Sequence, residues 1–116
     1  MRQIDVNLIK ETVSRLFIEA NYNLGNDIVS CIEESERNEK SSLAKDVLNK
    51  LLDNLNASKE INVPICQDTG MAIIFMNIGQ EVYFTGGSLK EAINDGVKDG
   101  YEKGYMRMSV VEDPLE

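Results

Sequence analysis

The apolar residues of this chain change their spacing at Pro64. Before it they recur at the three- and four-residue intervals of an amphipathic helix, and after it they form dense runs such as MAIIFMNIG. A helical period buries one face of a helix, whereas a short dense run between turn residues is typical of a buried strand. The sequence therefore predicts an α+β fold, in which N-terminal helices precede a small β-sheet and a further helix.

The first predicted helix covers residues 5–23 and ends at Gly25. A second, short helix follows, and the side chain of Asn26 or Asp27 is available to cap it. Cys31 falls on the apolar face of this second helix. We therefore expect Cys31 to lie in the core.

A third helix is predicted from about Ser42 to Ser58, after the polar loop SERNEKSS. It carries a dense apolar stripe, which we interpret as core, with a partner-binding face as the alternative. The stripe consists of Leu43, Val47, Leu48, Leu51, Leu52 and Leu55.

After Pro64 the pattern predicts a β-hairpin. MAIIFMNIG is typical of a mostly buried strand and EVYFTGG of its neighbour, and the two join near Gly79-Gln80. A last helix begins at the capping box SLKE and carries Gly96, Gly100 and Gly104. Because glycine costs about 1 kcal/mol in a helix interior, either this helix frays or another element packs closely against it.

The charge balance excludes some classes of partner. Twelve basic and twenty acidic residues give a net charge of -8, whereas nucleic acids and anionic membranes bind clustered Lys and Arg. At 116 residues the chain has the length of a single domain, residues 1–116. It contains no apolar stretch as long as a membrane span and no signal-peptide core, so we expect a cytoplasmic protein.

The chain contains two cysteines, Cys31 and Cys66, and no histidine. Two thiols are too few for a disulfide scaffold, and a reducing compartment keeps both as thiols. Without histidine, this chain alone cannot form a Ser-His or Cys-His catalytic pair or a histidine-containing zinc site.

The heptapeptide PICQDTG, residues 64–70, places a thiol, an amide, a carboxylate and a hydroxyl in succession. One interpretation is a turn that leads into a strand, with Cys66 buried. A reactive thiolate is a second interpretation, but it requires cationic neighbours, and the nearest charges are those of Asp68 and Glu60. A third is the DTG loop of aspartic proteases, in which two aspartates share a proton. That loop follows apolar residues in a nearly all-strand fold, and neither condition holds here.

The longer stretch PICQDTGM, with MRQIDVNLIKETV upstream and GYMRMSVVEDPLE downstream, resembles the N-terminal part of the iron–sulfur (class I) fumarate hydratase family. The likeness is to the separate alpha subunit of its two-chain members, which include L(+)-tartrate dehydratases, and it covers essentially the whole chain. It implies part of a hydro-lyase that reversibly hydrates fumarate to L-malate. L(+)-tartrate is the alternative substrate, and a non-catalytic interaction domain is the alternative from another class.

The resemblance also implies a cofactor and a set of site residues. The family holds a [4Fe–4S] cluster through three cysteine thiolates and leaves one iron open as a Lewis acid. By this resemblance Cys66 would be one cluster ligand, and Gln67 and Asp68 would direct polar groups to the substrate. Arg107, in GYMR, would bind a carboxylate of a small dicarboxylate substrate, and a solvated surface arginine is its alternative. No residue is assigned a catalytic role.

Part of such an enzyme would lie outside this sequence, because the family's alpha chain is longer and holds the remaining cluster cysteines elsewhere. We therefore expect residues 1–116 to be an N-terminal fragment that lacks the cluster and is inactive alone. Its partners would be the remainder of the alpha subunit and the beta subunit. We also expect a homo-oligomer, because apolar surface around the strands and residues 105–115 favours self-association.

Overall fold

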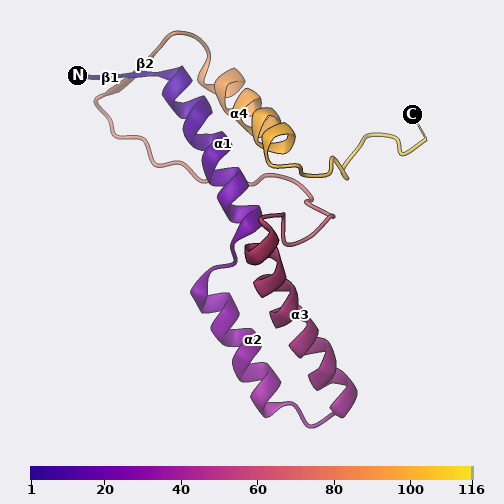
Figure 1. Ribbon diagram of the computed structural model, residues 1–116. Helices are drawn as coiled ribbons and strands as arrows, with labels where there is room; N and C mark the ends of the chain where they lie inside the picture. Colours follow the sequence, from indigo (N-terminus) through magenta and orange to yellow (C-terminus); the bar gives the residue numbers. More distant parts are fainter. Residues whose placement is uncertain (116) are drawn as a thin grey trace. The chain divides into compact units, whose positions relative to one another are not determined.

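The computed structural model describes residues 1–115 and confirms the predicted α+β class. The chain divides into two compact units, one formed by Ala20–Cys66 and the other by Met1–Glu19 together with the chain from Gln67 onward. In chain order, the elements drawn in Figure 1 are β1 (Arg2–Asp5), α1 (Val6–Tyr22), α2 (Asn26–Asn38), α3 (Ser42–Ile61), β2 (Val82–Thr85) and α4 (Leu89–Lys103).

The unit formed by Ala20–Cys66 is built on a hairpin of the two helices α2 and α3 (Figure 1). Ser41 caps α3, because its side-chain oxygen accepts a hydrogen bond from the Ala44 N–H at 3.3 Å. At the other end, Asn62 adopts a left-handed conformation with φ 54° and ends the helix. All three predicted helices of the N-terminal half are present, and α1 and α3 have nearly their predicted bounds.

Two predictions for this helical hairpin are wrong in detail. α2 extends to Asn38, so half of the predicted loop SERNEKSS is helical. Its N-cap residue is Gly25, so no side chain caps its first turn, although Asn26 or Asp27 was expected to do so. Cys31 is exposed rather than buried, and the leucine stripe is only partly core, since Leu43 is 74% exposed while Leu55 is buried. Within this unit each of the two helices packs mainly on the other. One neighbour covers only a strip of a helix, so the remaining apolar positions stay at the surface.

The other unit begins with a two-stranded parallel sheet, in which β1 pairs with β2 from Arg2 opposite Val82 onward. The long connection between the two strands contains α1, α2 and α3, since parallel strands require a crossover, and α4 follows β2. Ser88 caps α4 through a 3.4 Å hydrogen bond from the Glu91 N–H, which is the Ser88 half of the predicted capping box.

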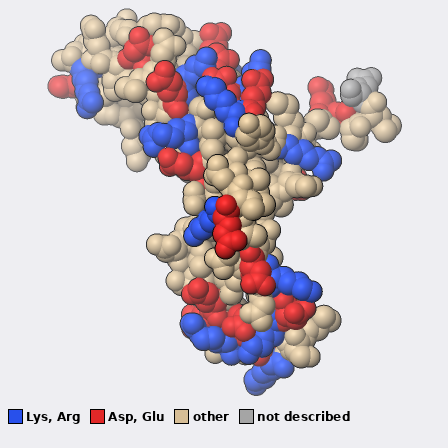
Figure 2. Space-filling model, in the orientation of Figure 1, with Lys and Arg blue, Asp and Glu red and all other residues tan. Residues whose placement is uncertain are grey.

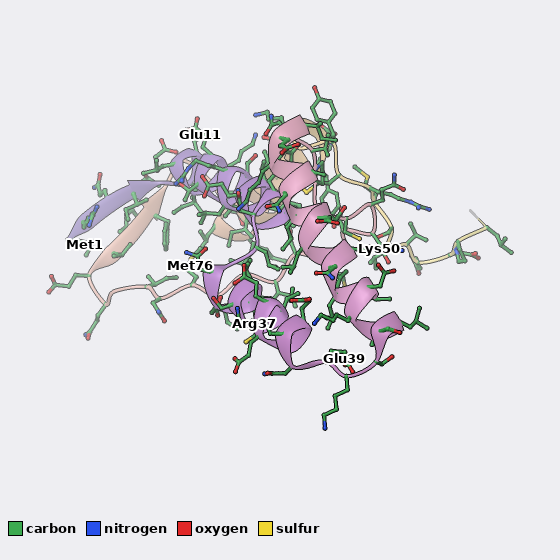
Figure 3. All side chains as sticks on the ribbon, turned by 60° about the horizontal axis from the view of Figure 1, so that its bottom comes forward. Met1, Glu11, Arg37, Glu39, Lys50 and Met76 are labelled. Atoms are coloured by element: carbon green, nitrogen blue, oxygen red, sulfur yellow. The ribbon has the colours of Figure 1, made fainter. Side chains whose placement is uncertain are left out.

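The predicted hairpin is wrong, because residues 71–79 form no strand and β2 pairs with β1 instead. The apolar run is a coil on which Met76, labelled in Figure 3, is half-exposed and Phe75 is 94% exposed. An apolar run becomes a strand only where a neighbouring strand completes its hydrogen-bond ladder. The described residues supply such a neighbour to β2 and none to residues 71–79.

The glycines of α4 allow α1 to pack directly against it (Figure 1). A Cβ atom added at Gly96 would lie 2.6 Å from the Lys10 carbonyl oxygen, and one added at Gly100 would lie 2.8 Å from Phe17 Cδ1. Both distances are shorter than real Cβ contacts. Of the two expectations for this glycine-rich helix, close packing is therefore confirmed.

Charges of both signs are interspersed on the face of the molecule shown in Figure 2. Some of them form ion pairs, such as Lys10 with Asp99 at 3.6 Å in one unit and Lys50 with Asp46 at 3.0 Å in the other. Among the helices of residues 1–115, none is both long and apolar enough to cross a membrane.

Candidate functional site

The motif PICQDTG crosses from one unit to the other. Pro64, Ile65 and Cys66 belong to the unit formed by Ala20–Cys66, and Gln67 begins the second part of the other unit. Apart from bends, the heptapeptide has no regular secondary structure. Its conformation therefore depends on hydrogen bonds from the elements around it, and each half is anchored to its own unit.

The first half of the motif is held at Ile65. Its N–H donates a 2.9 Å hydrogen bond to the Asn21 carbonyl, and its carbonyl accepts a 2.8 Å hydrogen bond from the Asn54 side-chain amide of α3. Cys66 follows directly and is exposed. The interpretation of Cys66 as a buried turn residue is therefore wrong, and an exposed thiol at the end of an anchored segment takes its place.

In the second half of the motif, Gln67 and Asp68 are exposed. Thr69 differs, because its hydroxyl oxygen is buried and has no hydrogen-bond partner among the described residues. Leaving such a group unpaired costs about 1–3 kcal/mol, so unpaired buried hydroxyls are uncommon. The motif thus contains a buried polar atom whose bonding the described chain does not complete.

Gly70, the last residue of the motif, is fixed by two side chains from distant parts of the sequence. Its N–H donates to Ser109 Oγ at 3.2 Å, and its carbonyl accepts a hydrogen bond from the Tyr101 hydroxyl of α4. The glycine has φ +71°, and a Cβ added to it would meet nothing within 4 Å. Glycine is therefore favoured here for its backbone conformation rather than for lack of space.

Arg107 lies just beyond α4, on a short segment that returns toward the motif. Met106 before it is buried, and the Ser109 N–H after it donates a 3.0 Å hydrogen bond to the Arg107 carbonyl. Arg107 itself is exposed. Since Ser109 also bonds Gly70, the structure brings the segments of Asp68 and Arg107 together, and each of these residues is two positions from the hydrogen-bonded pair.

Beside these segments is an open groove of about 640 Å³ within the same unit. Its floor is mostly apolar, with Met71, Ile74 and Met108 among the residues that line it, and Lys98 supplies a positive charge. The sequence did not predict this groove, nor the bonds that Tyr101 and Ser109 make to Gly70. The glycines of α4 left either fraying or close packing open, and they gave no sign that Tyr101 would reach the motif.

The described residues contain no group of three or more His, Cys, Asp or Glu side chains arranged to hold a metal ion. The whole chain has two cysteines and no histidine. If Cys66 bound an iron–sulfur cluster, the remaining ligands would therefore have to come from outside this chain.

The relatives of this chain share one kind of name. A protein of Methanocaldococcus jannaschii, provisionally named L(+)-tartrate dehydratase subunit alpha, is 35% identical over 104 residues, which are 89% of this chain and 36% of that protein. The L(+)-tartrate dehydratase subunit alpha of Escherichia coli K12 is 26% identical over 111 residues, 96% of this chain and 36% of that protein. The Shigella boydii protein of the same name matches equally. This chain thus spans little more than a third of the length of these relatives.

A comparison with protein families gives a match over nearly the same part of the chain. A family model described as Fumarate hydratase (Fumerase) matches residues 10–116, which include the exposed thiol of Cys66, the Gly70 hydrogen bonds and the Arg107 segment. From the match over nearly its whole length, it follows that this chain belongs to the fumarate hydratase family.

Proposed function

We propose that this chain is the N-terminal part of the alpha subunit of an iron–sulfur hydro-lyase that reversibly hydrates fumarate to L-malate. Membership of the fumarate hydratase family supports the reaction class. The structural observation that carries the proposal is the 3.2 Å hydrogen bond between Gly70 and Ser109. It joins the segment of Gln67 and Asp68 to that of Arg107, and these are the residues that the family resemblance assigns to the substrate.

Arg107 is the residue proposed to bind a substrate carboxylate. Arg107 is exposed, and a guanidinium can pair with a carboxylate through two parallel hydrogen bonds. A dicarboxylate needs such a local cation because the chain as a whole carries a net charge of -8. Gln67 and Asp68, both exposed, would contact the rest of the substrate.

Cys66 is proposed as one ligand of a [4Fe–4S] cluster. This chain's own residues do not fit a complete cluster, because it has only two cysteines, and the described residues place no three ligand side chains together. The other thiolates would come from the remainder of the alpha subunit, and the beta subunit would complete the enzyme. The names of the relatives, which are alpha subunits, support a second kind of subunit.

L(+)-tartrate is the second candidate substrate, and the names of the relatives favour it. Malate and tartrate are both four-carbon dicarboxylates that lose water across their two central carbons. Dehydration gives fumarate from malate and the enol of oxaloacetate from tartrate. A carboxylate contact from Arg107 would serve either acid, so the two substrates must be compared by measurement.

The test is to assemble this chain with the remaining alpha sequence and the beta subunit, and to assay L-malate and L(+)-tartrate side by side. Cys66→Ser should abolish turnover and weaken the iron–sulfur absorbance of the assembly. Cys31→Ser is the matched control, because Cys31 is also an exposed cysteine, and it should leave both signals intact. Full activity of the Cys66→Ser assembly would refute the ligand role.

A second arm concerns this chain alone. After anaerobic treatment with iron and sulfide it should hold no stable cluster and hydrate no fumarate, since one motif thiolate is too few. Fumarate hydration by the isolated chain would overturn the proposal that the remaining subunits are required.

A further inference from the structure

Gly70 is the residue through which the second half of the motif, residues 67–70, is fixed within its unit. Both of its backbone polar groups are bonded, the N–H to Ser109 Oγ and the carbonyl to the Tyr101 hydroxyl. These partners are 39 and 31 residues away in the sequence. We call this set of three residues, Gly70, Tyr101 and Ser109, the Gly70 anchor.

Tyr101 is itself held firmly in place. Its ring packs on that of Phe17 in α1, with centroids 4.9 Å apart and planes at 48°. Gly100 makes this contact possible, because a side chain there would collide with Phe17. The position of the tyrosine hydroxyl is therefore set by the close packing of α4 against α1.

Ser109 connects the anchor to the arginine segment. While its side chain accepts the bond from Gly70, its own N–H donates to the Arg107 carbonyl at 3.0 Å. Met106 is buried on the other side of Arg107. The backbone is thus held on both sides of Arg107. Ser109, which holds one of these sides, also bonds Gly70 of the motif.

We propose that Tyr101 and Ser109 are positioning residues that hold Asp68 and Arg107 in one fixed relation, so that both meet the same dicarboxylate. This inference rests on the function proposed above. Neither residue is assigned a contact with the substrate, because their hydroxyls bond the backbone of Gly70. The motif itself has no regular secondary structure. The two hydroxyls bond the N–H and the carbonyl of Gly70, which a neighbouring strand would bond in a β-sheet.

The proposal differs from a purely stabilising role in what it predicts for kinetics. Poor positioning of substrate-binding groups lowers kcat/KM even when the protein remains folded, since small displacements have large effects on rate. A stabilising role lowers the melting temperature and the amount of active enzyme, while kcat/KM per folded molecule stays the same.

The first experiment measures steady-state kinetics of the complete dehydratase that contains this chain. Tyr101→Phe keeps the ring and removes only the hydroxyl, and Ser109→Ala removes the acceptor. Each should lower kcat/KM about tenfold, as expected for a lost hydrogen bond that acts through position. Ser109→Thr keeps a hydroxyl and should recover most of the activity, while Tyr83→Phe, an exposed tyrosine of β2, should change nothing.

The second experiment needs no substrate. In the 116-residue chain, the Gly70 amide should be protected from hydrogen exchange, and Ser109→Ala should raise its exchange rate about tenfold. An unprotected Gly70 amide in the wild-type chain would overturn the inference, as would wild-type kcat/KM in both hydroxyl-deleted variants. A wild-type assembly that turns over neither diacid would instead overturn the proposed function, and the exchange measurement tells these failures apart.

Discussion

Gly96 of α4 lies against the backbone of α1, and its replacement by alanine tests how far the fold depends on that packing. The added Cβ would lie 2.6 Å from the Lys10 carbonyl oxygen and 3.0 Å from Val13 Cβ, both inside the 3.4 Å at which ordinary contact begins. The first of these neighbours is main chain, so the contact is relieved only if the helices separate. Overpacking of this kind costs about 3 kcal/mol.

Alanine also favours the helix over glycine by about 1 kcal/mol, which offsets part of that cost. The net effect expected for Gly96→Ala is a loss of about 2 kcal/mol in the free energy of unfolding. Urea denaturation followed by circular dichroism measures it as a lower midpoint at an unchanged slope. Asn94→Ala, at an exposed position of the same helix, is the control and should be neutral or slightly stabilising. A Gly96→Ala chain as stable as the wild type would refute the close-packing argument.

Three further changes test other contacts. Asn54→Ala removes the 2.8 Å hydrogen bond to the Ile65 carbonyl, so it should cost about 1 kcal/mol and raise the exchange rates of the Val63, Ile65 and Cys66 amides. Ser88→Ala deletes the cap of α4 and should lower the unfolding free energy by about 1 kcal/mol in thermal or urea melts, whereas Ser88→Asp should retain most of it. The exposed run 71–78 should make the isolated chain self-associate in sedimentation, and Phe75→Lys should reduce this; a monomer at high concentration would contradict it.

The helices were predictable because their signals are local. Apolar spacing, a terminal glycine and a serine cap lie within one or two turns of the residues they act on, so α1 and α3 appear near their predicted bounds and α4 begins at its predicted cap. Strand pairing is not local in this sense. The four residues Arg2–Asp5 have no apolar alternation of their own, and they form β1 only because β2 lies beside them.

In the candidate site, too, the local features were predictable from the sequence and the long-range contacts were not. The motif containing Cys66 and the segment containing Arg107 were visible in the sequence, since each is a short string of chemically distinctive residues. Their connection through Gly70 was not, because the hydroxyls of Tyr101 and Ser109 come from 31 and 39 residues away. Cys31 shows the opposite error. Its helical spacing predicted burial, but burial also requires a second element on that face, and periodicity carries no information about one.

The glycine face of α4 also limits changes in the length of that helix. One residue inserted between Gly96 and Gly100 would rotate everything beyond it by about 100° and turn Tyr101 away from Phe17. Four inserted residues would restore the facing to within about 40°, but they would displace Tyr101 by about 6 Å along the helix axis. Neither change alters composition much, yet each would remove the hydroxyl from Gly70. In α4, therefore, the number of residues is constrained more strictly than the identity of most of them.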